Sequence, residues 1–324
     1  MHACELQETA PAGRVCPVWI FVVWCRSFML QQSSIGSYDT SLGIMCSGTS
    51  AILISLFCTV IHVYFHRCHS AVVYAVEKPF QWLFGLPGSF GAALLLGAAG
   101  GYPVGAKTIA TLYQQGQCSR RDAEKALRFC NNAGPAFLIS AVGASLLQDP
   151  HAGLKLYAVH VLSALIIGFI YRKNTDYVKY HCITADHMRS TATISLFLRA
   201  VTDAFSSFLN VSAFVLIFSV ISTMLQQLPL IDSLHCLPGG GILWYGLLAG
   251  FLELTSGVAC LTQGGLPSSI LLPALSFLCG WGGCSVQFQT INLLHDAGLS
   301  CSQYLKSKLL QGILAALITG MICF

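Results

Sequence analysis

Long runs of apolar residues separated by short polar stretches make up most of the chain beyond residue 41. A helix needs roughly 20 apolar residues to cross the hydrocarbon core of a membrane, and several runs approach or exceed that length. We expect membrane segments at 41–65, 133–147, 154–171, 211–225, 241–261 and 309–324. The pattern predicts an all-α integral membrane protein with about seven to nine membrane segments.

Two further apolar segments, 88–115 and 269–294, contain helix-breaking residues near their centres. The interruptions are Gly100, Gly101, Pro103 and Gly105 in the first segment and Gly280, Gly282 and Gly283 in the second. Proline lacks a backbone donor, and paired glycines weaken a helix. We therefore predict two Gly-broken elements, which either cross the membrane as discontinuous helices or fold back as re-entrant hairpins.

The two broken segments align with each other without gaps at a spacing of 182 residues. Identical positions are Gly100/Gly282, Gly101/Gly283, Thr108/Thr290, Ile109/Ile291, Leu112/Leu294 and Gly116/Gly298. Such internal repeats are common in transporters. We predict a variable N-terminal part at 1–41, in which 15–30 is a weak span, a signal-like segment or an interfacial helix, and two repeats at 42–190 and 191–324. Inverted and parallel arrangements of the repeats both remain open.

Composition and charge narrow the class of protein. The chain of 324 residues is 55% hydrophobic and only 9% charged, with a net charge of +4. These values exclude a soluble domain, which is about one quarter charged, and the small positive excess forms no surface for nucleic acid. Basic residues gather in the loops at 117–128 and 172–189, whereas 226–240 has only Asp232. The first two loops are predicted to be cytoplasmic and the third to lie on the opposite face.

Polar side chains at membrane depth are the candidate functional groups. Glu253, followed by Thr255, lies within an apolar span, where an ionisable group suggests a role in a transport pathway unless it lies nearer an interface. Lys107, one turn beyond the first break, either faces the same cavity as an anion anchor or snorkels to a helix end. Arg199 and Asp203 are four residues apart and are expected to pair on one helix face.

Further hydrogen-bonding groups follow both breaks. Asn131 and Asn132 begin the motif NNAGP, where they either cap the next helix or line the pathway. Ser285, Gln287 and Gln289 alternate after the second break, a pattern that seldom faces lipid. The predicted binding site comprises Gly100, Gly101, Tyr102, Pro103, Lys107, Asn131, Asn132, Glu253, Thr255, Gly282, Gly283, Ser285, Gln287 and Gln289.

No cofactor or metal site is predicted. The fifteen cysteines form no CxxC pair. His62 and His66 in HVYFHRCH are one helical turn apart, but they are more simply read as marking the end of a span. The chain contains no HExxH motif and no GxSxG motif with a partnering histidine, so we expect no enzyme.

In order along the chain, the motifs GGYPVGAK, FCNNAGPAFLISAVG, GFLELTSG and GWGGCSVQFQ resemble the sporulation integral membrane protein family, whose halves match the nucleoside-recognition (gate) domain. The resemblance runs from about residue 42 to the end. It departs from the family at Gly100-Gly101-Tyr102-Pro103, where Ser-Gly-Tyr-Pro is usual. It implies uptake of dipicolinate, an aromatic dicarboxylate, across the outer forespore membrane of a sporulating bacterium.

Three functions remain open at this point. The leading expectation is a transporter of a small anionic solute coupled to a proton or sodium gradient, or to none. A transporter of a nucleoside or another small solute is the alternative within the same class. A non-transporting assembly protein of the spore membrane is the third, because Gly-rich surfaces also favour helix packing.

Overall fold

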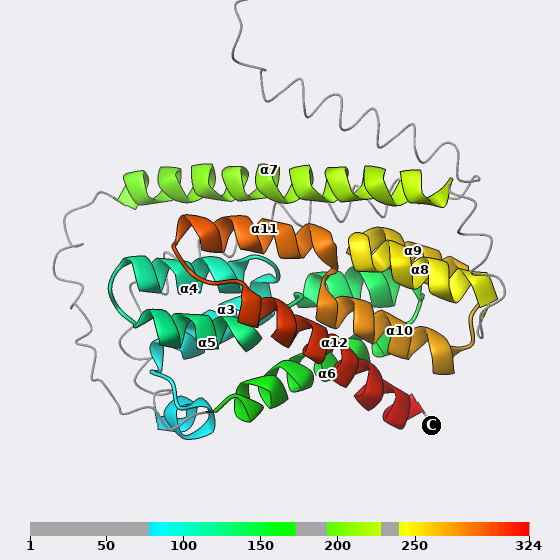
Figure 1. Cartoon of the computed structure of the whole chain (residues 1–324), viewed down its shortest axis with the longest axis horizontal. Coiled ribbons are helices and arrows are strands. Elements are labelled where there is room, and N and C mark those ends of the chain that lie inside the picture. The colour runs from blue at the N-terminus through cyan, green and yellow to red at the C-terminus, as the bar shows by residue number, and fades with distance from the viewer. Residues whose placement is uncertain (1–77, 173–192, 228–239, 324) are drawn as a thin grey trace, which may run out of the picture. The chain divides into compact units, whose positions relative to one another are not determined.

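The computed structural model describes residues 78–172, 193–227 and 240–323, and every regular element in these residues is a helix (Figure 1). After a short helix at Lys78–Phe84, the elements are α3 (Ser89–Gly100), α4 (Val104–Gln114), α5 (Arg120–Cys130), η1 (Ala136–Leu146), α6 (Pro150–Ile170), α7 (Thr193–Gln226), α8 (Gly240–Leu252), α9 (Leu254–Gln263), α10 (Ser268–Trp281), α11 (Gly283–Asp296) and α12 (Ser302–Cys323). The element η1 is a π-helix. The all-α prediction is confirmed for this part of the chain.

Four stretches in the described residues are long and apolar enough to cross a membrane. They are Pro150–Ile170, Val201–Leu225, Ser268–Asp296 and Ser302–Ile322. A fifth is present if Lys78–Phe84 and α3, bent by 81° at their junction, are taken as one span. The predicted count of seven to nine is not confirmed, and the predicted segments at 15–30 and 41–65 lie outside the described residues.

Two predicted segment boundaries were wrong. The segment 241–261 is not one helix, because the chain breaks at Glu253 between α8 and α9. The predicted segment 211–225 is only the last part of a longer helix, since α7 continues for 34 residues. It packs against α11 and α8, and the rings of Phe218 and Phe288 lie 5.3 Å apart.

Two helix pairs fold back on themselves as hairpins, α3 with α4 and α8 with α9 (Figure 1). Glycines allow the close approach in both. A Cβ atom at Gly97 would lie 3.0 Å from Gly105 Cα, and Gly257 lies directly against the backbone of Gly250. The hairpin tips are therefore at the α3/α4 break and at Glu253.

The order of elements repeats once along the chain. A hairpin, two shorter helices and a long helix occur first as α3, α4, α5, η1 and α6, and again as α8, α9, α10, α11 and α12. Corresponding helices begin about 150 residues apart, as internal duplication would place them. The contacts between helices correspond as well. The long helix of each half contacts the third helix of the other half, in the pairs α6–α10 and α12–α5. The second helix of each half contacts the fourth helix of the other half, in the pairs α4–α11 and α9–η1.

The predicted register of 182 residues is not confirmed by this arrangement. It pairs the tip of the α3/α4 hairpin with the break between α10 and α11, which stand at different places in the element order. Both places have a glycine at positive φ at the break, Gly101 (φ 80°) and its aligned partner Gly283 (φ 78°). The matching glycines in the two segments therefore reflect the same backbone conformation at two breaks, and these breaks do not occupy equivalent positions in the order of helices.

The long helix α12 holds the two halves together. It packs against α10, α6 and α5. A Cβ atom at Gly280 would lie 2.6 Å from Gly312 Cα, so α10 and α12 cross in backbone contact. Further along the crossing, the hydroxyl oxygens of Ser276 and Thr319 are 2.6 Å apart. One face of α12 is thereby fixed in the interior of the protein.

Candidate functional site

Four interruptions of helices meet in the interior. Each hairpin tip packs against the break in the next helix pair, because a Cβ atom at Gly101 would lie 3.0 Å from Gly134 N and one at Gly283 would lie 2.9 Å from Leu254 N. Tyr102 connects the two halves. Its hydroxyl donates to the carbonyl of Cys279 at 3.3 Å, and a Cβ atom at Gly282 would lie 3.4 Å from Tyr102 Cζ.

Asn131 and Asn132 lie at the break between α5 and η1 and are fully buried. The side-chain Nδ2 of Asn131 donates to the hydroxyls of Tyr304 at 3.0 Å and Thr290 at 3.3 Å, and its side-chain Oδ1 accepts from Ala106 N at 3.4 Å. Asn132 donates to the carbonyl of Phe129 at 2.7 Å. These side chains therefore join α4, α11 and α12 at the break instead of only capping one helix.

Lys308, on α12, lies at the centre of this region and is completely buried. Its Nζ donates to the backbone carbonyl oxygen of Asn131 at 2.8 Å and to Gln311 Oε1 at 2.6 Å. The same nitrogen lies 5.1 Å from the centre of the Tyr102 ring. Within the described residues this nitrogen forms no ion pair with a carboxylate. The ammonium is thus surrounded by neutral acceptors.

Gln311 and His160 complete the cluster. The Gln311 amide donates to Asn132 Oδ1 and to the His160 carbonyl, both at 3.2 Å. The imidazole Nε2 of His160 accepts from Ala133 N at 3.0 Å. The long helices α6 and α12 are therefore linked to the α5/η1 break by hydrogen bonds.

The sequence analysis missed these residues of the long helices. Tyr304, Lys308 and Gln311 occur at i, i+4 and i+7 in α12, and this spacing places them on one face. A polar stripe of that kind was the available signal. It was overlooked because the segment was predicted to start at residue 309, which left Lys308 in a loop.

Glu253 is buried at the tip of the α8/α9 hairpin, where it caps α9. Its carboxylate accepts from Thr255 N at 3.1 Å, Ser256 N at 2.7 Å and the Thr255 hydroxyl at 2.6 Å. A carboxylate at this place also meets the positive end of the helix dipole. The capping bonds explain how a lone acid is held among apolar residues.

Lys107 does not join the Lys308 cluster. Its Nζ donates to Ser207 Oγ of α7 at 3.0 Å, and its side chain is only partly buried. Asp203, one turn before Ser207 on α7, is exposed. The Arg199 side chain lies outside the described part of the chain, so the predicted pairing of Arg199 with Asp203 is not tested. The lysine at the helix breaks is therefore Lys308 and not Lys107.

The first turns of α11 carry three buried amide or hydroxyl side chains with unused hydrogen-bonding capacity. Gln287 Nε2 donates to the Trp281 carbonyl. Ser285 Oγ, Gln287 Oε1 and Gln289 Nε2 have no partner within the described residues. Because buried polar groups are normally paired, this part of α11 is suited to a polar ligand.

No group of three or more metal-ligating side chains occurs in the described ranges. His62, His66, Cys68 and His69 lie outside them. The site thus consists of amides, hydroxyls, one buried ammonium and one capping carboxylate, which suits binding of a polar organic solute.

The chain is similar in sequence to a known membrane protein. The sporulation integral membrane protein YlbJ of Bacillus subtilis (strain 168) is 29% identical over an alignment of 274 residues, which covers 76% of this chain and 67% of the relative. The chain is similar to the YlbJ-like sporulation membrane proteins. This similarity and the apolar helices confirm the predicted resemblance to that family and a place in a membrane. No family model and no solved structure matches the chain, and the gate-domain assignment stays a prediction.

Proposed function

We propose that the protein is a transporter that carries dipicolinate, or a closely related small dicarboxylate, across the outer forespore membrane of a sporulating bacterium. The observation that carries the proposal is Lys308, a buried lysine at the meeting point of the helix breaks whose described contacts are all neutral. The similarity to a sporulation membrane protein supports the setting.

An ammonium has three donors, and the two acceptors that Lys308 contacts leave room for a third. A buried charge without an opposite charge is costly, and a carboxylate from a substrate would remove that cost. The Tyr102 ring beside the ammonium offers a face on which a planar aromatic solute would stack. A dicarboxylate on an aromatic ring matches both groups.

A second carboxylate would find donors at α11. The helix α11 begins at a break without a side-chain cap, so its first amide groups present a partial positive field toward the interior. Ser285 Oγ and Gln289 Nε2 are unpaired donors on the same helix. The arrangement favours an anion over a neutral nucleoside, which would leave the ammonium uncompensated.

The test is uptake of labelled dipicolinate by liposomes that contain the purified protein, with imposed proton, sodium or no gradients. Lys308→Gln should reduce the affinity for dipicolinate roughly 30-fold or more, because removing one member of a buried charge pair costs at least about 2 kcal/mol. The matched control is Lys306→Gln, which removes an exposed lysine from the same turn of α12 and should leave uptake unchanged.

Three outcomes would contradict the proposal. Equal dipicolinate uptake by the parent and by folded Lys308→Gln would exclude the anchor role. Uptake of a nucleoside but not of dipicolinate would assign the site to a neutral solute, and the absence of any uptake together with binding to a spore-membrane partner would indicate an assembly protein.

A further inference from the structure

A cluster of basic side chains runs along α5, from its first turn to its last. Arg121, Lys125 and Arg128 are spaced at i, i+4 and i+7 on that helix and share one face. Arg172, just beyond the end of α6, is close enough to act on Lys125 electrostatically. Burial lowers the pKa of the Lys125 ammonium, the three arginines lower it further, and Asp122 opposes them. Four like charges are therefore held together.

Neighbouring aromatic rings and the backbone hold these charges in place. The Arg128 guanidinium lies 4.3 Å from the centre of the Tyr171 ring, and that of Arg172 lies 6.0 Å from the Trp82 ring. Lys125 Nζ donates to the Gly85 carbonyl at 3.4 Å. Arg128 Nε is buried and has no hydrogen-bond partner in the described ranges, so one donor of the cluster is unused.

The exposure of Trp82 indicates at which level of a membrane the basic cluster lies. Its side chain is 68% exposed, while Phe80 and Phe84 of the same short helix are buried and pack near the ring of Phe129. The candidate span Pro150–Ile170 ends two residues before Arg172. Exposed tryptophan next to basic residues at the end of a span is typical of the headgroup region.

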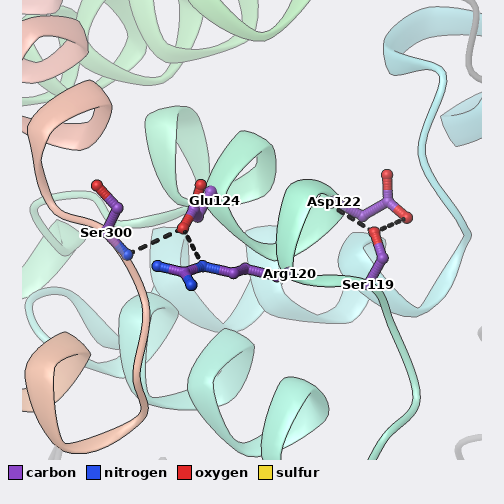
Figure 2. Close-up of polar contacts among 5 residues, drawn as sticks. All are labelled: Ser119, Arg120, Asp122, Glu124 and Ser300. Atoms are coloured by element: carbon purple, nitrogen blue, oxygen red, sulfur yellow. Dashed lines mark hydrogen bonds and ion pairs between the residues drawn. The ribbon is translucent and has the colours of Figure 1, made fainter.

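Glu124 of α5 is engaged away from this cluster, whereas Asp122 lies close enough to Lys125 to act on it electrostatically. Figure 2 shows Glu124 accepting hydrogen bonds from Arg120 Nε at 2.9 Å and from Ser300 N at 3.0 Å, and the Ser119 hydroxyl contacting Asp122 at 2.8 Å. Arg120 is thus neutralised by its own helix. Arg121, Arg128 and Arg172 form no ion pair within the described residues.

We propose that Arg121, Lys125, Arg128 and Arg172 form a binding site for the phosphate headgroup of an anionic phospholipid. Guanidinium groups bind phosphate oxygens in a bidentate manner, and basic pockets at the cytoplasmic ends of membrane helices suit anionic lipid headgroups. The bound lipid would place its acyl chains beside the exposed Trp82 and neutralise the clustered charge. This site is separate from the helix breaks and from the proposed transport function.

The test is lipid retention by the full chain, extracted from vesicles of equal parts phosphatidylglycerol and phosphatidylcholine and analysed by native mass spectrometry. The parent should retain phosphatidylglycerol preferentially. Arg128→Gln combined with Arg172→Gln should reduce that preference about 30-fold, as expected for two basic residues near a membrane surface. Arg120→Gln is the matched control, because it removes the same charge from the paired face of α5 and should keep the preference.

Two additional measurements make the result decisive. Arg128→Lys keeps the charge but not the planar fork, so partial loss of phosphatidylglycerol in this folded variant supports a guanidinium–phosphate contact. Equal retention by the double variant and the parent, or equal loss in Arg120→Gln, would overturn the proposal. Displacement of the lipid by millimolar inorganic phosphate would also overturn it, since the site would then be one for the free anion.

Discussion

The carboxylate of Glu253 caps α9, a role that its position in an apolar run of the sequence does not reveal. Its position in an apolar run suggests a titrating group in a pathway, whereas the structure gives the carboxylate three donors at the start of α9. A role in coupling and a role in capping are compatible, since both use a carboxylate at a helix break. Substitutions that keep or remove the acceptor separate the two.

Glu253→Ala should lower the free energy of unfolding by about 1–2 kcal/mol, because it removes the acceptor for the amides of Thr255 and Ser256. Glu253→Gln retains one acceptor oxygen and should lose less. Thermal unfolding of the purified variants in one detergent measures both. A loss for Gln as large as that for Ala would show that the cap does not depend on the acceptor.

The same Glu253→Gln variant tests proton coupling. If Glu253 carries the coupled proton, uptake should lose its dependence on an imposed pH gradient although the protein folds. Uptake with the parent's dependence on the gradient would leave Glu253 with its capping role only.

At the scale of elements, close helix contacts depend on glycine. The crossing of α10 and α12 has no space for a side chain at Gly312, where a Cβ atom would lie 2.8 Å from the Phe277 carbonyl. Gly320, two turns further along α12, has nothing within 4 Å of an added Cβ. The two positions therefore separate steric from conformational effects on one helix.

Gly312→Ala should destabilise the protein by about 1–3 kcal/mol, since the two helices must move apart. Gly320→Ala should be neutral or stabilising by up to about 1 kcal/mol, because alanine favours a helix. Thermal unfolding of both variants checks the difference. A smaller effect at Gly312 than at Gly320 would contradict the observed crossing.

The elements also show what the sequence predicted and what it could not. Paired glycines and Pro103 correctly located a break after Gly100, because their backbone requirements are local. The break at Glu253 was missed, since no glycine or proline stands there and the capping bonds form only in the folded chain. Likewise, Lys308 and Asn131 are 177 positions apart, and only packing brings them together.

At the scale of the whole molecule, orientation follows from the basic loops. The basic segment 117–128, most of which forms α5, is predicted to be cytoplasmic and 226–240 to face the other side. Cysteines introduced at Arg120 and Ser233, in a background without native cysteines, should be labelled by an impermeant maleimide from opposite sides. Labelling of both positions from one side would contradict the predicted topology.

The native Cys118 provides a control for that experiment. Burial raises the pKa of its thiol to about 12, and Asp122 adds to the effect, so little thiolate exists at neutral pH. A variant that retains only Cys118 should react slowly from either side. Rapid reaction would show that this loop opens in the membrane.

The meeting of four helix breaks has a consequence for isotope exchange. Peptide amides at the start of α11 have no side-chain cap, whereas Ala106 N of α4 is bonded to Asn131 Oδ1 and the amides at the start of α9 are held by Glu253. In D2O, amides deep in the molecule at 283–285 should therefore take up deuterium sooner than the continuous ladders of α6 and α12. The most exchangeable interior backbone would trace a water-accessible route across the protein.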